Sequence, residues 1–181
     1  GEAVSGQPDD VVLAAIANRT RIAFELDPSQ AELWVNRFAD ALHAARQNDP
    51  LLHGRLLRFQ AELAEQHSDL KGAHEYLAQA LSMYKAGLSQ PGISATLLHN
   101  GQVYARQAHW VEARKELQRG TAVRIRMLDG KGAADGLEML ADVEQQLGNR
   151  EVSKQLAQWV RVIRADGPVD WQAVRLTIQS P

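Results

Sequence analysis

The segment AVRIRMLDGKGAADG, residues 122–136, has the composition of a phosphate-binding loop. VRIRM alternates apolar and charged residues as a strand does, and Gly130, Gly132 and Gly136 follow it. A dinucleotide-binding loop needs the spacing G-x-G-x-x-G between a strand and a helix. Here the spacing is G-x-G-x-x-x-G, and no other segment has the pattern of a parallel strand. We therefore interpret the segment as the end of one helix, a turn and the start of the next.

Histidine is the other residue type whose number could indicate chemistry. No histidine has a second one three or four positions later, which is the spacing that a metal site on a helix usually needs. The chain has no cysteine, and it contains neither a G-x-S-x-G nucleophile motif nor a P-loop. We expect no catalytic residue, no metal and no cofactor, and we assign solvated or capping roles to His43, His53, His67, His74, His99 and His109.

Composition restricts the class of protein further. The 181 residues are 45% hydrophobic and 23% charged, which is ordinary for one globular domain. A net charge of -2 provides no general attraction to nucleic acid. The longest apolar run, residues 11–17, is far shorter than the roughly 20 residues that span a bilayer. Residues 1–10 lack the features of a signal peptide, and we expect them to be a flexible segment. The missing initial Met suggests a domain of a longer protein.

Leu, Ala, Gln, Arg and Glu dominate the sequence, and helix breakers recur at intervals that suit helices of about 16 to 19 residues. Proline near a first helical position marks four starts, at Pro28, Pro50, Pro91 and Pro168. Asp27 and Asp49 precede two of these prolines as N-cap residues. The pattern predicts an all-α chain with nine helices, at 11–26, 29–47, 51–67, 70–88, 91–108, 110–128, 132–147, 150–165 and 169–179.

Three blocks of the sequence are similar to one another. Leu57, Leu97 and Leu137 align at a step of 40 residues, since 97 − 57 and 137 − 97 are equal. Similarity at a fixed period predicts stacked supersecondary units, here at about 51–88, 91–128 and 132–165. We expect one helical-repeat domain over 11–181, in which helix 169–179 caps the exposed face of the last block. The other aligned positions are Ala61, Gly101 and Ala141, and then Ala73, Ala113 and Ser153.

These blocks resemble tetratricopeptide repeats. The middle block matches the family pattern best, with Leu97, Gly101, Tyr104, Ala108, Ala113 and Leu117. The ordinary period of that family is 34 residues, and the longer step resembles the variety of kinesin light chains and many bacterial regulators. The resemblance covers about 57–165. The third block departs from the pattern because Glu144 replaces the aromatic residue, and the helix pairing within residues 11–50 stays open.

The resemblance implies an α-solenoid of antiparallel helical hairpins that binds an extended peptide or a helix along a concave groove. It places the groove on the first helix of each block, and one end would be cationic and the other anionic. The family's clamp for a terminal carboxylate is not matched. We expect a protein or peptide partner with a basic portion near the third block. The candidate groove residues are Arg55, Arg58, Phe59, Glu62, Leu98, His99, Gln102, Arg106, Asp135, Glu138, Met139 and Asp142.

Together these features predict a non-catalytic interaction module, an adaptor or scaffold within a larger regulatory or signalling protein. The alternative is a ligand-sensing or dimerising domain that controls an attached kinase or DNA-binding domain. A nucleic-acid reader would need a continuous basic stripe, and the acidic end of the groove argues against one.

Overall fold

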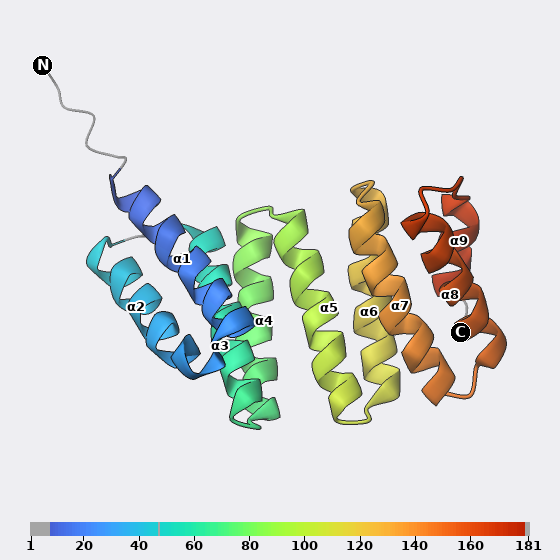
Figure 1. Cartoon of the computed structure of the whole chain (residues 1–181), viewed down its shortest axis with the longest axis horizontal. Coiled ribbons are helices and arrows are strands. Elements are labelled where there is room, and N and C mark those ends of the chain that lie inside the picture. Colours follow the sequence, from blue (N-terminus) through green and yellow to red (C-terminus); the bar gives the residue numbers. More distant parts are fainter. Residues whose placement is uncertain (1–7, 47, 180–181) are drawn as a thin grey trace, which may run out of the picture. The chain divides into compact units, whose positions relative to one another are not determined.

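The computed structural model describes residues 8–46 and 48–179, and over them the chain is helical without any strand (Figure 1). The predicted all-α, helical-repeat fold is therefore confirmed. In this part of the chain nine α-helices and one short 3-10 helix follow one another. They are α1 Pro8–Leu26, η1 Pro28–Gln30, α2 Ala31–Ala44, α3 Pro50–Gln66, α4 Leu70–Ala86, α5 Gln90–Arg106, α6 Trp110–Arg126, α7 Gly130–Gln146, α8 Arg150–Arg164 and α9 Trp171–Gln179.

Two predicted helix starts differ from the structure. Asp27 does not cap a helix with its side chain, because its carboxylate accepts a hydrogen bond from the Ser29 hydroxyl at 2.6 Å. The segment after it forms η1 before α2 begins. The last helix starts at Trp171, because the Asp170 carboxylate accepts hydrogen bonds from two backbone N–H groups of its first turn at 3.0 Å each. Asp49 does cap α3, as predicted, by accepting from Leu51 N–H at 2.8 Å. Most of the predicted segment 1–10 lies outside the described residues.

A step of 40 residues governs the helical hairpins. The first helices α3, α5 and α7 begin at residues 50, 90 and 130, so that 90 − 50 equals 130 − 90. The second helices α4, α6 and α8 begin at residues 70, 110 and 150. The repeat found in the sequence is therefore a repeat of the backbone.

The turns between these helices share one conformation. A residue with positive φ recurs every 20 positions, at Ser68, Leu88, Ala108, Leu128 and Gly148. At Leu128 the N–H donates to the Ile125 carbonyl and the Asp129 N–H donates to the Arg124 carbonyl, at 3.1 and 3.0 Å. These two bonds satisfy carbonyls that the helix end leaves unpaired. The Asp129 carboxylate then starts α7 by accepting from Gly132 N–H at 2.9 Å. The glycine-rich segment is the turn that the sequence predicted.

The chain divides into two compact units, Gly1–Leu88 and Ser89–Pro181. In the first unit α1 pairs with α2, α3 pairs with α4, and both α1 and α2 contact α3. This settles the pairing that the sequence left open. The Thr20 hydroxyl on α1 lies 3.2 Å from the Trp34 carbonyl on α2 and joins the two helices. The buried cluster consists of Leu13, Ala17, Val35, Phe38, Leu42, Leu56 and Phe59.

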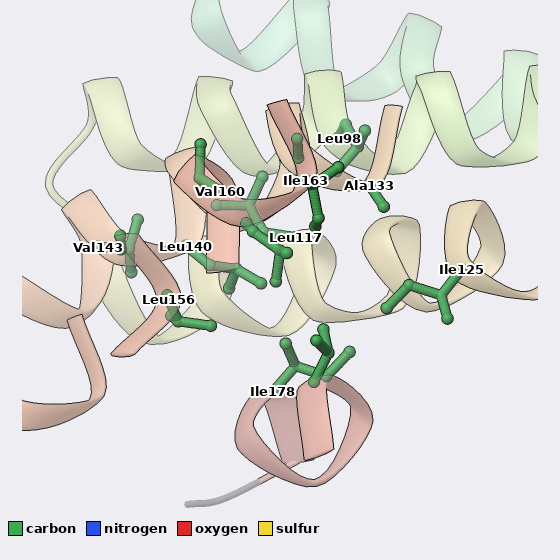
Figure 2. Packing of buried hydrophobic residues seen from close by; sticks show 14 of the residues in the cluster. Leu98, Leu117, Ile125, Ala133, Leu140, Val143, Leu156, Val160, Ile163 and Ile178 are labelled. Carbon is green, nitrogen blue, oxygen red and sulfur yellow. The ribbon is translucent and has the colours of Figure 1, made fainter. Parts of the chain in front are cut away.

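In the second unit α5 pairs with α6, α7 pairs with α8, and α6 contacts α7. Glycine permits the two helices of a hairpin to approach each other closely. A Cβ atom on Gly101 would lie only 2.6 Å from Leu117 Cγ, and one on Gly120 would lie only 2.9 Å from Leu98 Cδ2. The core between these helices contains Leu98, Leu117, Leu140, Leu156 and Val160 (Figure 2).

Helix α9 packs against α6 and α8. Val174 and Ile178 are buried, and Ile178 points from α9 towards α6 (Figure 2). The apolar stripe predicted on this helix is thus used. The stripe packs against α6 and α8, which are the second helices of their hairpins. The sequence predicted that it would cover the exposed face of the last hairpin.

Candidate functional site

The described residues contain no group of three or more His, Cys, Asp or Glu side chains that could hold a metal ion. Among those same residues, no helix combines the length and the apolar character that crossing a membrane requires.

The candidate residues of the first block lie together at a hollow of about 420 Å³ between α1 and α3. Helix α3 supplies all four predicted residues, and α1 forms the opposite wall. The contribution of α1 was missed, because the family pattern does not extend to that helix. The lining is Ala17, Asn18, Arg21, Phe24, Glu25, Arg55, Arg58, Phe59 and Glu62.

Phe59 forms the floor of this hollow. Its ring stacks on Phe24 of α1 with centroids 5.8 Å apart and an interplanar angle of 11°, and its edge meets Phe38 of α2 at 6.2 Å. Only 7% of Phe59 is exposed. The residue is therefore mainly a core residue that offers a small apolar surface.

Two arginines provide the positive charge at this hollow. Arg55 is exposed, and Arg58 is half-buried and hydrogen-bonded to Tyr84 of α4. Burial raises the pKa of Tyr84, and the neighbouring Arg58 and Arg55 lower it by less. The Arg58 Nε is buried and has no hydrogen-bond partner within the described residues. Arg21 is paired with Glu25 at 2.7 Å, so it adds little net charge.

The residues of the second block do not form a hollow of this kind. Leu98 is buried against Gly120 and belongs to the core, so it is not an exposed contact. His99 is half-buried, whereas Gln102 and Arg106 are exposed on α5.

The acidic residues of the third block have a cationic neighbour that the sequence did not reveal. Arg164 of α8 donates to both carboxylate oxygens of Glu138, at 3.0 and 2.8 Å, and approaches Asp135 at 3.4 Å. The hydrogen bond from Arg164 holds the pKa of Glu138 below its ordinary value. Asp142 is exposed, and Met139 is half-buried against the core. Arg164 thus offsets one of the three negative charges, Asp135, Glu138 and Asp142, at the anionic end of the predicted groove.

A second hollow, of about 530 Å³, lies on the face that α7 and α8 share. It contains Glu138 and Asp142 of the predicted site, and α8 supplies both of its arginines. The lining is Glu138, Ala141, Asp142, Ala157, Val160, Arg161, Arg164 and Ala165.

Glu144 occupies the position where the resemblance expects an aromatic residue. It is 3% exposed, accepts a hydrogen bond from the Asn149 side chain at 2.6 Å and lies 4.0 Å from Arg114. A buried carboxylate needs such partners, and here they tie the end of α7 to the next turn. We assign Glu144 a structural role.

No family model matches the chain, and no curated protein matches it. The tetratricopeptide resemblance therefore rests on the residues and on the 40-residue hairpin step.

Proposed function

We propose that the chain is a non-catalytic interaction module of the tetratricopeptide type, which binds a protein or peptide segment along the exposed faces of its first helices. In this proposal it acts as an adaptor or scaffold within a larger regulatory or signalling protein.

The observation that carries the proposal is the hollow between α1 and α3. The four groove residues predicted for the first block line this hollow, and Phe59 among them supplies an aromatic surface. The exposed Arg55, with the half-buried Arg58 on the same helix, suits an acidic group, because guanidinium groups bind carboxylates with fixed geometry.

The hollow thus favours a partner that places an acidic side chain or carboxylate beside an apolar group. Helices held by a packed core present these side chains in advance, which lowers the ordering cost of binding. Of the acids expected to meet a basic portion near the third block, Glu138 and Asp135 are already in contact with Arg164.

Affinity capture from a cell lysate, followed by mapping of the bound segment and titration of that peptide, tests the proposal. Arg55→Glu should weaken peptide binding by about tenfold or more, because it places a like charge beside the acidic group. Arg55 is exposed, so the variant should fold normally.

Lys85→Glu is the matched control, since Lys85 is an exposed cation near the end of α4 and does not line the hollow. Equal affinities of wild type and Arg55→Glu for every captured segment would contradict the proposed site.

The second candidate function is a dimerising regulatory domain. The hollow on α7 and α8 favours this second function. It has apolar side chains between charged ones, and none of its residues lines the hollow that contains Arg55.

A further inference from the structure

The face formed by α7 and α8 is equivalent, one repeat later, to a face of α5 and α6 that is covered. Subtracting 40 from Glu138, Ala141 and Arg161 gives Leu98, Gly101 and Thr121. Helix α7 covers that earlier face: a Cβ on Gly136 would lie against Thr121 and 3.3 Å from Leu98 Cδ2. The last hairpin therefore repeats a surface on which its predecessor receives a helix.

Nothing in the described second unit covers the later face. Helix α9 packs on α6 and α8 and contributes no residue to the hollow. Its floor is a strip of small or apolar side chains, which includes Ala141, Ala157 and Val160. Such a strip allows two helices to approach closely.

Charges border this strip in an ordered way. The acids Glu138 and Asp142 lie on α7, and Arg161 and Arg164 lie on α8. The Glu138 and Arg164 side chains satisfy each other within the hairpin. Asp142 and Arg161, both exposed, have no ion-pair partner within the described residues. The face therefore carries one unmatched negative charge on one helix and one unmatched positive charge on the other.

We propose that this face is the contact between two copies of the chain, related by a two-fold axis that runs along the hairpin. That axis places α7 of each copy over α8 of the other. Asp142 then meets Arg161 of the second copy, and the same pair forms twice, as an isologous contact requires. A two-fold axis across the hairpin would set α7 against α7 and bring the acids together. The charge pattern selects the first arrangement.

The chemistry of the face fits association that can reverse. Glu138 and Arg161 occupy the positions that are equivalent to Leu98 and Thr121 of the covered face. Because both residues are charged, the face of a single copy can be solvated. Ala141 and Val160 are only 7% and 6% exposed, so the strip adds a small apolar area, and the two ion pairs at its border fix the orientation.

Sedimentation velocity on the full chain, at concentrations up to roughly 1 mM, tests the proposal. The wild type should dimerise, and Asp142→Arg and Arg161→Asp should each raise the dimer dissociation constant by about tenfold or more, because each places like charges in contact. An equimolar mixture of the two variants should recover the dimer. In the mixed pair, the arginine introduced into one chain meets the aspartate introduced into the other, and the two unchanged residues, Arg161 and Asp142, meet each other.

Arg126→Asp is the matched control, because Arg126 is exposed at the end of α6 and lies outside the face. If either reversal impairs folding, Asp142→Asn and Arg161→Gln provide the same test with smaller effects. A wild type that stays monomeric would overturn the proposal and leave the face to a helix of another protein. Dimers that survive both reversals, or variants that fail to combine, would overturn it as well.

Discussion

Arg164 on α8 holds Glu138 on α7 with two hydrogen bonds, one to each carboxylate oxygen. The two residues are 26 positions apart in the sequence and belong to the two helices of one hairpin. This paired contact joins the middle of α7 to the last residue of α8. It also offsets one of the three negative charges, Asp135, Glu138 and Asp142, that the sequence alone would give this surface.

Replacing Arg164 with Gln should raise the pKa of Glu138 towards the ordinary glutamate value. The hydrogen bond from Arg164 is the largest cause of the lowered pKa, and its charge adds to the effect. A pH titration of the Glu138 carboxyl by NMR measures this change. Arg161→Gln serves as the control, because Arg161 lies on the same face without an ion pair to Glu138. An unchanged Glu138 titration in the Arg164 variant would show that the contact does not form in solution.

Replacing Asp129 with Ala should lower the free energy of unfolding by about 1 kcal/mol at neutral pH, because α7 loses its N-cap. The hydrogen bond from Gly132 N–H, together with Arg124, holds the pKa of Asp129 below its usual value. The stabilisation is therefore fully present above the ordinary aspartate pKa and is lost as pH falls through the lowered one. Urea unfolding of both proteins across acidic pH should show the two stabilities converging. A difference that stays constant with pH would contradict this account.

Leu128→Gly should stabilise the second unit by roughly 1 kcal/mol, since a left-handed conformation costs an L-residue about that much. Leu128 has a φ of 58° and is 82% exposed, so little buried surface is lost. Gly148→Ala is the reverse experiment at the next turn, where φ is 84°, and it should destabilise. Denaturant midpoints of the two variants should move in opposite directions. Equal shifts of the two midpoints would show that the turn conformation does not cause the change in stability.

Gly120→Ala should destabilise the second unit by about 1–3 kcal/mol, because the new methyl group overpacks the hairpin. Its Cβ would lie 2.9 Å from Leu98 Cδ2 and 3.1 Å from the Leu98 backbone nitrogen. Gly130→Ala is the control in the same unit, since its nearest neighbour would be Ile163 Cγ2 at 3.7 Å. That change should be neutral or gain up to about 1 kcal/mol from helix propensity. Thermal unfolding of the two variants compares them directly.

The helices and their step could be predicted because local features determine them. Apolar periodicity, prolines at helix starts and the recurrence of Leu57, Leu97 and Leu137 are all visible in the sequence. The left-handed turn residues were harder to foresee. Only Gly148 among the five is a glycine, so packing of the helices on either side must impose the conformation on the other four.

The candidate site was predicted less well, because it depends on contacts between distant segments. Phe59 and Leu98 were chosen as exposed groove residues, yet α1 and α2 bury Phe59, and the space above Gly120 receives Leu98. Arg164 could not be assigned to Glu138 from spacing within a single helix. The position of α1 over α3 lies outside the repeat pattern altogether.

The division of the chain at Leu88 also affects how the molecule responds to stress and to ligands. Each half buries its own cluster of apolar side chains, so each contains its own source of free energy that resists opening. A ligand at Arg55 and Arg58 would slow amide hydrogen exchange in α1 and α3, which line its hollow. Self-association would slow exchange in α7 and α8, which form the proposed contact. Hydrogen exchange would therefore report the two binding events at separate helices of one chain.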